Sequence, residues 1–320
     1  MSKPFAWLKN FALLLALGLA SCLSPAHAAF INGQNYVPVA DWARANGLKC
    51  FWLKRGDEIV AANRATRLVF DKDSRMVEVN GINVALSFPV AVDKGTPLIA
   101  QLDLNTTIRP LLSPPKAADA KRITTICLDP GHGGKDTGNH TFWRSEKTYT
   151  LALALELRDQ LKKVGFNVIL TRSKDAYVEL PDRPVLANRR GADLFVSLHF
   201  NSFAPEQKEA GLETFCLTPA GMPSTLTRDY ADYVAQVFPN NAHDVENWAY
   251  AVKLHRALLR TNLLADRGVR HARFMGVLRG QNRPALLIEG GYLSNPAEAR
   301  RIAAPAFRQK LAEAMAAALK

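Results

Sequence analysis

Residues 122–320 alternate short strand-like runs with longer helical ones, and this alternation limits the fold more than any other feature. The strand-like runs read TTICLD, NVILT, DLFVSLHF, ETFCL, FMGVL and ALLIEGG. Helical spacing is found over residues 149–164, 183–190, 246–264 and 305–319. Such alternation is typical of an α/β domain. We therefore expect a mostly parallel or mixed twisted sheet that is flanked by helices.

Residues 30–110 predict a smaller, strand-rich α+β domain. Its strand-like runs read FWLK, EIVAAN, TRLVF, MVEVNG and NVALS, and a short helix is expected over residues 39–46, ended by Gly47. Residues 111–121 contain two prolines followed by small and charged residues, a composition that suits an exposed linker. We therefore place the linker at 111–121 and the α/β domain at 122–320.

The first 28 residues have the pattern of a secretory signal. Lys3 and Lys9 precede the apolar run 11–20, which is too short to anchor in a bilayer. Two processing sites compete: AHA at 26–28 fits signal peptidase, whereas LASC at 19–22 resembles a lipobox that would end the signal at residue 21 and lipidate Cys22. The sequence thus predicts export to the periplasm or cell envelope, with membrane attachment only if Cys22 is lipidated.

Charge and cysteine content restrict the partners and the kinds of site. A formal net charge of +12 favours an anionic partner, and export argues against nucleic acid. Peptidoglycan carboxylates and wall or lipid phosphates remain, as does a basic surface without any partner. Cys50, Cys127 and Cys216 follow the signal, and an odd number without a C-x-x-C pair predicts neither a disulfide framework nor a cysteine zinc site.

Candidate catalytic residues follow the strand-like runs, where open α/β sheets hold their ligands. His132 lies in the turn DPGHGG, in which glycines let a ligand approach the backbone. A phosphate-binding loop would need glycine at position 129 and Ser or Thr at position 136, and both are aspartate. Glu146 begins a helical run, where an acidic residue is common for electrostatic reasons alone.

His199 and Glu289 each end a strand-like run. Alternation along the strand places His199 on the face opposite Leu198 and Phe200. A glutamate at the end of a buried strand requires a cation or a catalytic duty, because carboxylates are rarely buried without a partner. Two histidines and one glutamate form a ligand set that leaves zinc an open position for water, and a further carboxylate can move the proton.

Seven segments in the same order resemble the zinc-dependent N-acetylmuramoyl-L-alanine amidase family, from about Arg122 to the C-terminus. They read DPGHGGKDTG, SEK, NVILTR, ANRRGADLFVSLHFN, GLETF, DRGVRHARF and ALLIEGGYLSN. The resemblance implies hydrolysis of the amide bond between N-acetylmuramic acid and L-alanine in peptidoglycan, with one Zn²⁺ per catalytic domain. By position, His132, Glu146 and His199 resemble the zinc ligands, and Glu289 resembles the catalytic glutamate.

The N-terminal domain resembles the copper-amine-oxidase N-terminal-like stalk domain of exported wall proteins. The resemblance rests on NGQNYVP at residues 32–38 and on the turn VNG at residues 79–81. It implies no copper, and this part of the sequence contains no cluster of metal-binding residues. We expect a role in binding or spacing.

Several features leave alternatives open. Asn139 stands where the family usually has a small residue, which puts substrate contacts rather than the metal in doubt. His140 is either a surface residue or a further participant. Some family members carry an inserted helix that blocks the zinc until a partner removes it. The long segment 217–245, with helical spacing at 227–238, is therefore either such a gate with an envelope activator protein or a surface excursion.

Two rival functions also stay open. The first is another zinc amidase or peptidase of the envelope, which would use the same ligand set on a different bond. The second is a non-catalytic wall-binding protein that retains the fold. Zinc content and the position of newly formed ends in digested wall distinguish these alternatives.

Overall fold

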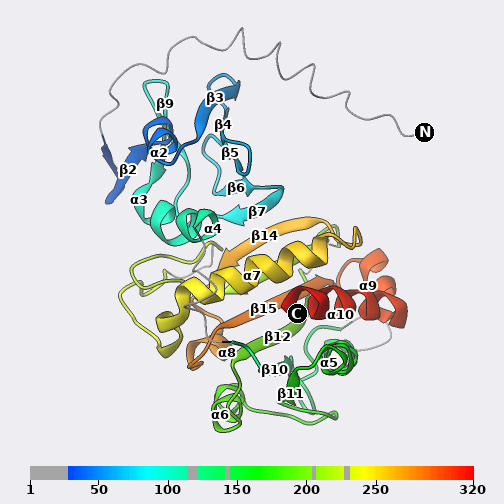
Figure 1. Ribbon diagram of the computed structural model, residues 1–320. Helices are drawn as coiled ribbons and strands as arrows, with labels where there is room; N and C mark the ends of the chain where they lie inside the picture. The colour runs from blue at the N-terminus through cyan, green and yellow to red at the C-terminus, as the bar shows by residue number, and fades with distance from the viewer. Residues whose placement is uncertain (1–27, 114–121, 141–144, 204–206, 227–230) are drawn as a thin grey trace, which may run out of the picture. The chain divides into compact units, whose positions relative to one another are not determined.

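The computed structural model describes residues 28–113, 122–140, 145–203, 207–226 and 231–320 (Figure 1). These described residues form two compact units, the first within residues 28–81 and 89–101 and the second within residues 82–88 and 102–320. The expected signal segment, except for residue 28, and Cys22 lie outside the described residues. Among the residues that are described, no helix is long and apolar enough to cross a membrane.

The first unit is strand-rich, as predicted. It contains one sheet in the order β1-β2-β9-β8 and a meander of four antiparallel strands, β3 to β6. The bounds are β1 Ala29–Ile31, β2 Gln34–Pro38, α2 Val39–Ala45, β3 Lys49–Lys54, β4 Glu58–Ala62, β5 Arg67–Asp71, β6 Met76–Val79, β8 Ala91–Asp93 and β9 Thr96–Ala100. Asn80 and Gly81 both have positive φ, which confirms the predicted turn.

The second unit is built on a mixed sheet in the order β11-β10-β12-β15-β13-β14-β7. All neighbours are parallel except β13 and β15, which run antiparallel. The strands are β7 Ile82–Ala85, β10 Thr125–Pro130, β11 Asn167–Leu170, β12 Leu194–Asn201, β13 Leu212–Cys216, β14 Asp266–His271 and β15 Ala285–Tyr292. This arrangement confirms the predicted α/β class.

Helices cover both faces of this sheet (Figure 1). On one face α10 packs between α5 and α7, and on the other α6 and α8 close a core that includes Phe195 and Phe215. The bounds are α3 Gln101–Asp103, η1 Leu104–Ile108, α4 Arg109–Leu112, α5 Glu146–Lys163, α6 Asp182–Arg189, η2 Pro239–His243, α7 Asp244–Leu259, α8 Gly276–Arg279, α9 Pro296–Ala303 and α10 Pro305–Leu319.

One predicted strand is wrong. The run FMGVL, residues 274–278, forms a turn and the start of α8, and the strand of this region is β14, residues Asp266–His271. Two arginines and an aspartate make β14 look like surface loop in the sequence. Its two arginines instead form ion pairs with glutamates, as in the pair of Arg270 with Glu213.

The expected boundary at residues 111–121 does not coincide with the division into compact units. β7, predicted as part of the N-terminal domain, belongs to the second unit because Val84 pairs with Val269 of β14. The backbone N–H of Asn83 donates to Asp266 Oδ2 at 2.7 Å, and Trp248 Nε1 donates to the carbonyl of Thr107 at 2.9 Å. Residues 114–121 lie outside the described part of the chain.

The segment 217–245 contains no long helix in its described part. Residues 231–238 form turns instead of the predicted helix, and residues 227–230 are not described. Arg273 holds the segment by donating to the carbonyls of Thr218 and Pro219, and Arg273 also lies over the ring of Phe238. Its hydrogen bonds among the described residues also reach Ser87, Thr106, His271 and Arg283, none of which is a candidate site residue.

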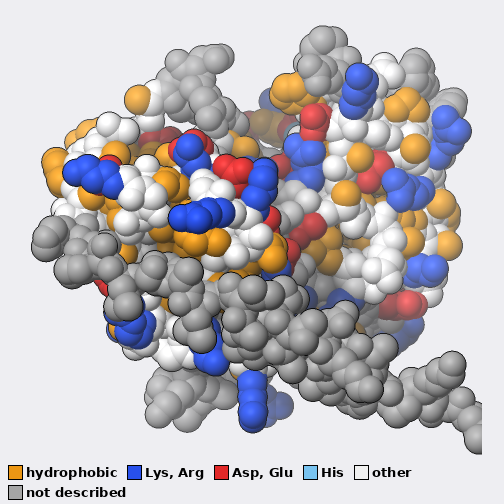
Figure 2. Space-filling view, turned by 90° about the horizontal axis from the view of Figure 1, so that it is seen from above, with side chains coloured by type: hydrophobic (Ala, Val, Ile, Leu, Met, Phe, Trp, Pro, Cys, Tyr) orange, Lys and Arg blue, Asp and Glu red, His pale blue; other side chains and the backbone are white. Residues whose placement is uncertain are grey.

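The described surface mixes charge types. In the face shown by Figure 2, Lys and Arg side chains are interspersed with acidic and hydrophobic ones rather than gathered in one patch. On this face the Lys and Arg side chains are thus spread among other side chains, which favours no single docking site for a polyanion there.

Candidate functional site

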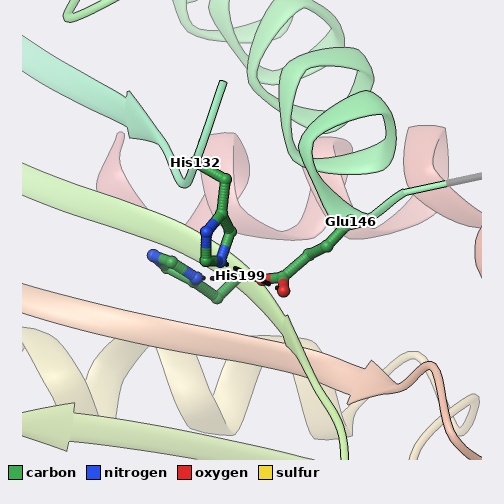
Figure 3. Close-up of side chains that lie close together, drawn as sticks. All are labelled: His132, Glu146 and His199. Atoms are coloured by element: carbon green, nitrogen blue, oxygen red, sulfur yellow. Dashed lines mark hydrogen bonds and ion pairs between the residues drawn. The ribbon is translucent and has the colours of Figure 1, made fainter. Parts of the chain in front are cut away.

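His132, Glu146 and His199 point toward one another at the carboxyl edge of the sheet (Figure 3). One ligand atom of each lies within 4.8 Å of the others, so the three side chains form a group that could hold a metal ion. Glu146 Oε2 lies 3.1 Å from His132 Nε2, and Glu146 Oε1 lies 2.9 Å from His199 Nδ1. The structure therefore brings together three residues that are separated by up to 67 positions in the sequence (199 − 132).

Glycines allow the two imidazoles to lie this close to the backbone. A Cβ on Gly131 would stand 2.2 Å from the ring of His199, and one on Gly138 would stand 2.6 Å from His132 and 2.7 Å from Glu146. His132 itself has φ +62°, a left-handed conformation that is uncommon for residues other than glycine. The turn is thus shaped around the three side chains, and there is no room for larger residues at these positions.

Asn139 holds the carboxylate of Glu146 in place. Its backbone N–H and its side-chain Nδ2 both donate to Glu146 Oε2, at 3.0 and 2.9 Å, and the Glu146 N–H donates back to the Asn139 carbonyl at 2.7 Å. The N–H of Phe200 donates to the other carboxylate oxygen at 3.2 Å. Asn139, expected from the sequence to affect substrate contacts, instead supports the candidate ligand.

The pKa shifts in this group keep Glu146 ionised beside His132. Burial opposes ionisation of Glu146, but the hydrogen bonds and charges of His132 and His199 hold its pKa well below the usual range. Burial would likewise lower the pKa of His132, yet Glu146 and Asp136 outweigh it and raise that pKa. The lowered pKa keeps Glu146 as a carboxylate, the form that binds a cation, whereas a proton on His132 must leave before that imidazole can bind a metal.

Glu289 lies beside this group on the next strand. It pairs in parallel register with His199, so both side chains leave the same face of the sheet. Its Oε2 is buried and has no hydrogen-bond partner among the described residues. Burial first, and then the negative charges of Glu146 and Glu213, raise the pKa of Glu289 well above its usual range. A carboxyl group in this setting is suited to exchange a proton with a substrate.

Glu213 lies on the other side of Glu289 and was not singled out from the sequence. The two glutamates pair across β13 and β15. Glu213 accepts hydrogen bonds from Asn201 Nδ2 at 2.9 Å and Tyr292 OH at 2.7 Å, and Arg270 Nε lies 3.0 Å from its Oε1. The sequence ETFCL could have indicated a functional residue, because a glutamate within an apolar run is unusual. The partners of Glu213, however, come from three other segments of the chain.

A buried polar network holds the backbone of the turn that contains His132. Asp129 accepts hydrogen bonds from Thr171, Arg183 and Ser197 at 2.6, 2.7 and 2.8 Å. Arg172 donates to the carbonyls of Pro130 and Gly131, and Arg183 donates to the carbonyl of His132. This network fixes the position of His132, and its members were not assigned a role from the sequence although NVILTR marks one of the arginines.

The remaining histidine of the turn is exposed. His140 Nε2 lies 2.9 Å from the Thr137 hydroxyl and is not part of the group that could hold a metal. Cys127 and Cys216 are buried free thiols, and burial raises the pKa of each. The cysteines therefore carry neither a disulfide nor a metal group among the described residues.

Comparison with known proteins gives consistent results. A family model described as N-acetylmuramoyl-L-alanine amidase matches residues 126–320. N-acetylmuramoyl-L-alanine amidase AmiA of Escherichia coli K12 is 32% identical over 228 residues, which cover 64% of this chain and 78% of AmiA. N-acetylmuramoyl-L-alanine amidase AmiC of Escherichia coli O6:H1 is 31% identical over 260 residues, which cover 72% of this chain but only 62% of AmiC.

A solved structure supports the same relationship. The crystal structure of an N-acetylmuramoyl-L-alanine amidase from Clostridium difficile 630 aligns with a TM-score of 0.52 and 30% identity. The alignment covers 62% of this chain and 95% of that one. The likeness therefore concerns the unit that contains the four candidate residues.

Proposed function

Because this chain belongs to the N-acetylmuramoyl-L-alanine amidase family, we propose that it hydrolyses the amide bond between the lactyl group of N-acetylmuramic acid and L-alanine in peptidoglycan. The observation that carries the proposal is the convergence of His132, Glu146 and His199 beside Glu289. The substrate class follows from the family, and the residues supply the hydrolytic step. Peptidoglycan is accordingly the proposed partner, and export to the cell envelope the proposed location.

We propose that the group His132, Glu146 and His199 holds Zn²⁺. Two imidazoles and one carboxylate match the donor set of catalytic zinc, and the glycine-lined turn brings these donors together. When bound, zinc would activate a water molecule and polarise the scissile carbonyl. Asp136 Oδ2 lies 2.9 Å from His132 Nδ1 and would orient that imidazole, as carboxylates commonly do for metal-binding histidines.

Glu289 is the proposed general base and subsequent proton donor. Its carboxyl lies on the same face of the sheet as His199, and this supports a role for it beside the metal-bound substrate. In the proposed cycle it accepts a proton from the water that attacks and returns it to the leaving amine of L-alanine. The buried Oε2 without a partner among the described residues is available for this transfer.

We propose that the first unit binds the cell wall or acts as a spacer, and that it takes no part in catalysis. Among the described residues, the group that could hold a metal lies entirely in the second unit.

A lipid anchor at Cys22, an envelope activator and a gate in residues 217–245 stay predictions of the sequence. Intact mass of the protein extracted from membranes would detect the lipid, which adds acyl chains to Cys22.

The decisive experiment is mass spectrometry of fragments released from purified peptidoglycan, with and without a chelator. The proposal expects new ends at the lactyl carboxyl of muramic acid and at the amine of L-alanine, and loss of both when the metal is removed. New ends between amino acids would instead favour an envelope peptidase. Wall binding without any product would favour a non-catalytic protein that retains the fold.

A further inference from the structure

We infer that Arg270 binds a carboxylate in the peptide part of the substrate, an inference that rests on the proposed function. The subsite lies on the same face of the sheet as the candidate catalytic residues. The subsite consists of Glu213, which forms an ion pair with Arg270, and of Arg270 itself, whose terminal nitrogens have no partner among the described residues. It would make the enzyme prefer a stem peptide with a free carboxylate close to the scissile bond.

Strand register places Arg270 in line with the candidate site. His199, Glu289 and Glu213 are successive partners across β12, β15 and β13, so their side chains leave one face of the sheet. Arg270 of β14 pairs with Phe215, which alternation puts on the same face as Glu213. The row therefore runs from a candidate metal ligand through a candidate base to a cation.

The hydrogen bonding and the exposure of the Arg270 guanidinium suit it to bind a ligand. Arg270 Nε lies 3.0 Å from Glu213 Oε1 but is buried without a well-aligned hydrogen bond. Among the described residues, Glu213 is the one partner of this guanidinium. The side chain is 16% exposed, so a ligand can reach it. An arginine in this state presents a planar fork that fits a carboxylate with two parallel hydrogen bonds.

The neighbouring arginine does not compete for this role. Arg267 forms ion pairs with Glu209 and Glu213, and its guanidinium lies 5.0 Å from the centre of the Tyr292 ring. These contacts occupy it on three sides. Arg267, Arg270, Glu209 and Glu213 balance in formal charge, so an added carboxylate is bound by the fork of Arg270 and not by a general positive field.

The distances suit a short stem peptide. Two strand spacings, about 10 Å, separate β15 from β14, and the long side chain of Arg270 leans back toward Glu213. An extended chain advances about 3.5 Å per residue, so a carboxylate on the second residue lies roughly 7 Å from the attacked carbonyl. Such a carboxylate reaches the guanidinium when the peptide leaves the site across β13 toward β14.

The test compares two muropeptides that differ in one group, the carboxylate of the second stem residue being free in one and amidated in the other. We expect the wild-type protein to hydrolyse the free-acid form about 10- to 100-fold more efficiently, mainly through KM, the range for a charge-assisted hydrogen bond. Arg270→Gln should abolish this preference while still cleaving the amide form. Arg158→Gln changes a partly exposed arginine on α5, is the matched control and should keep the preference.

The outcomes are distinguishable. Equal hydrolysis of both substrates by the wild-type protein, or equal loss on both in Arg270→Gln, would overturn the carboxylate subsite and leave the proposed function intact. Cleavage of neither substrate at the muramoyl amide by the wild-type protein would count against the proposed function itself. If circular dichroism shows Arg270→Gln to be unfolded, Arg270→Lys replaces it. That variant keeps the charge beside Glu213 but lacks the fork, and it should also lose most of the preference.

Discussion

Glu289 of β15 stands in register with His199 of β12, so a buried carboxyl and a candidate metal ligand occupy adjacent places on one face of the sheet. The pairing keeps the two side chains together without any bond between them. The surroundings of the two side chains differ, because His199 contacts Glu146 whereas Glu289 Oε2 has no partner among the described residues. The proposed ligands and the proposed base should therefore fail in different ways when they are changed.

The first prediction separates metal binding from proton transfer. His132→Ala, Glu146→Ala and His199→Ala each remove one donor, so zinc content and hydrolysis should fall together. Glu289→Ala leaves the three donors intact, so we expect about one zinc per chain but turnover reduced by roughly 10²–10⁴. Zinc analysis and muropeptide hydrolysis on the four purified variants decide this, with circular dichroism to check the fold. Loss of zinc from Glu289→Ala would make this residue a ligand, and full activity would refute its role as base.

The second prediction concerns the glycines of the turn. In Gly131→Ala the new Cβ would stand 2.2 Å from the His199 ring, and in Gly138→Ala it would stand 2.6 Å from His132. Neither imidazole can move without leaving the candidate metal position, so the affinity for zinc should fall in both variants. Gly276→Ala is the control because the nearest atom to its Cβ is 4.0 Å away. Unchanged zinc affinity in both turn variants would show that the described geometry does not hold the donors.

The third prediction concerns the network below the turn. Asp129→Ala leaves Arg183 buried without its carboxylate, so unfolding free energy should drop by about 3–5 kcal/mol, the usual cost of breaking a buried ion pair. Asp159→Ala, which breaks an exposed pair with Arg158, should cost no more than about 1 kcal/mol. Urea unfolding of the two variants provides the comparison. Similar small losses would mean that water replaces the Asp129 carboxylate.

The fourth prediction is a pH dependence of stability. Complete burial lowers the pKa of His271 from 6.5 to about 3. Between these values the unfolded chain binds a proton that the folded chain does not, so this contribution is present above about pH 6.5 and lost as the pH falls toward 3. The loss is about 1.4 kcal/mol per pH unit within that window. His271→Phe keeps a ring stacked on Trp248 and should flatten the profile in urea unfolding. A profile as steep as that of the wild type would assign the effect to other groups.

The fifth prediction concerns removal of the N-terminal domain. A positioning role predicts that deletion of residues 30–110 weakens attachment to insoluble wall but spares hydrolysis of soluble muropeptides. The same deletion, however, takes β7 from β14 and the Thr107 acceptor from Trp248, both within the second unit. We therefore expect a lower Tm for this deletion than for one of residues 30–79, which keeps both contacts. Thermal unfolding and hydrolysis of the two truncated proteins test this, and equal Tm values would contradict it.

The sequence by itself determined the fold class and the four candidate residues. Periodicity and short motifs are local, so the runs ending in His199 and Glu289 could be recognised as strands without knowing their neighbours. Family blocks then assigned roles to His132 and Glu146. The positions of most elements were also readable, because helices such as α10 and strands such as β12 carry their apolar pattern within a few residues.

Tertiary structure alone decided how these residues are grouped and supported. Register between strands brings Glu213 beside Glu289, and it depends on pairing between residues 76 positions apart (289 − 213). The sequence of β14 also did not reveal that the side chain of Arg270 lies beside that of Glu213, because this ion pair joins two different strands. The same holds for β7, whose strand pattern was visible but whose partner, Val269, lies far along the chain. Sequence patterns report the local surroundings of a residue, whereas these contacts exist only after distant segments have met.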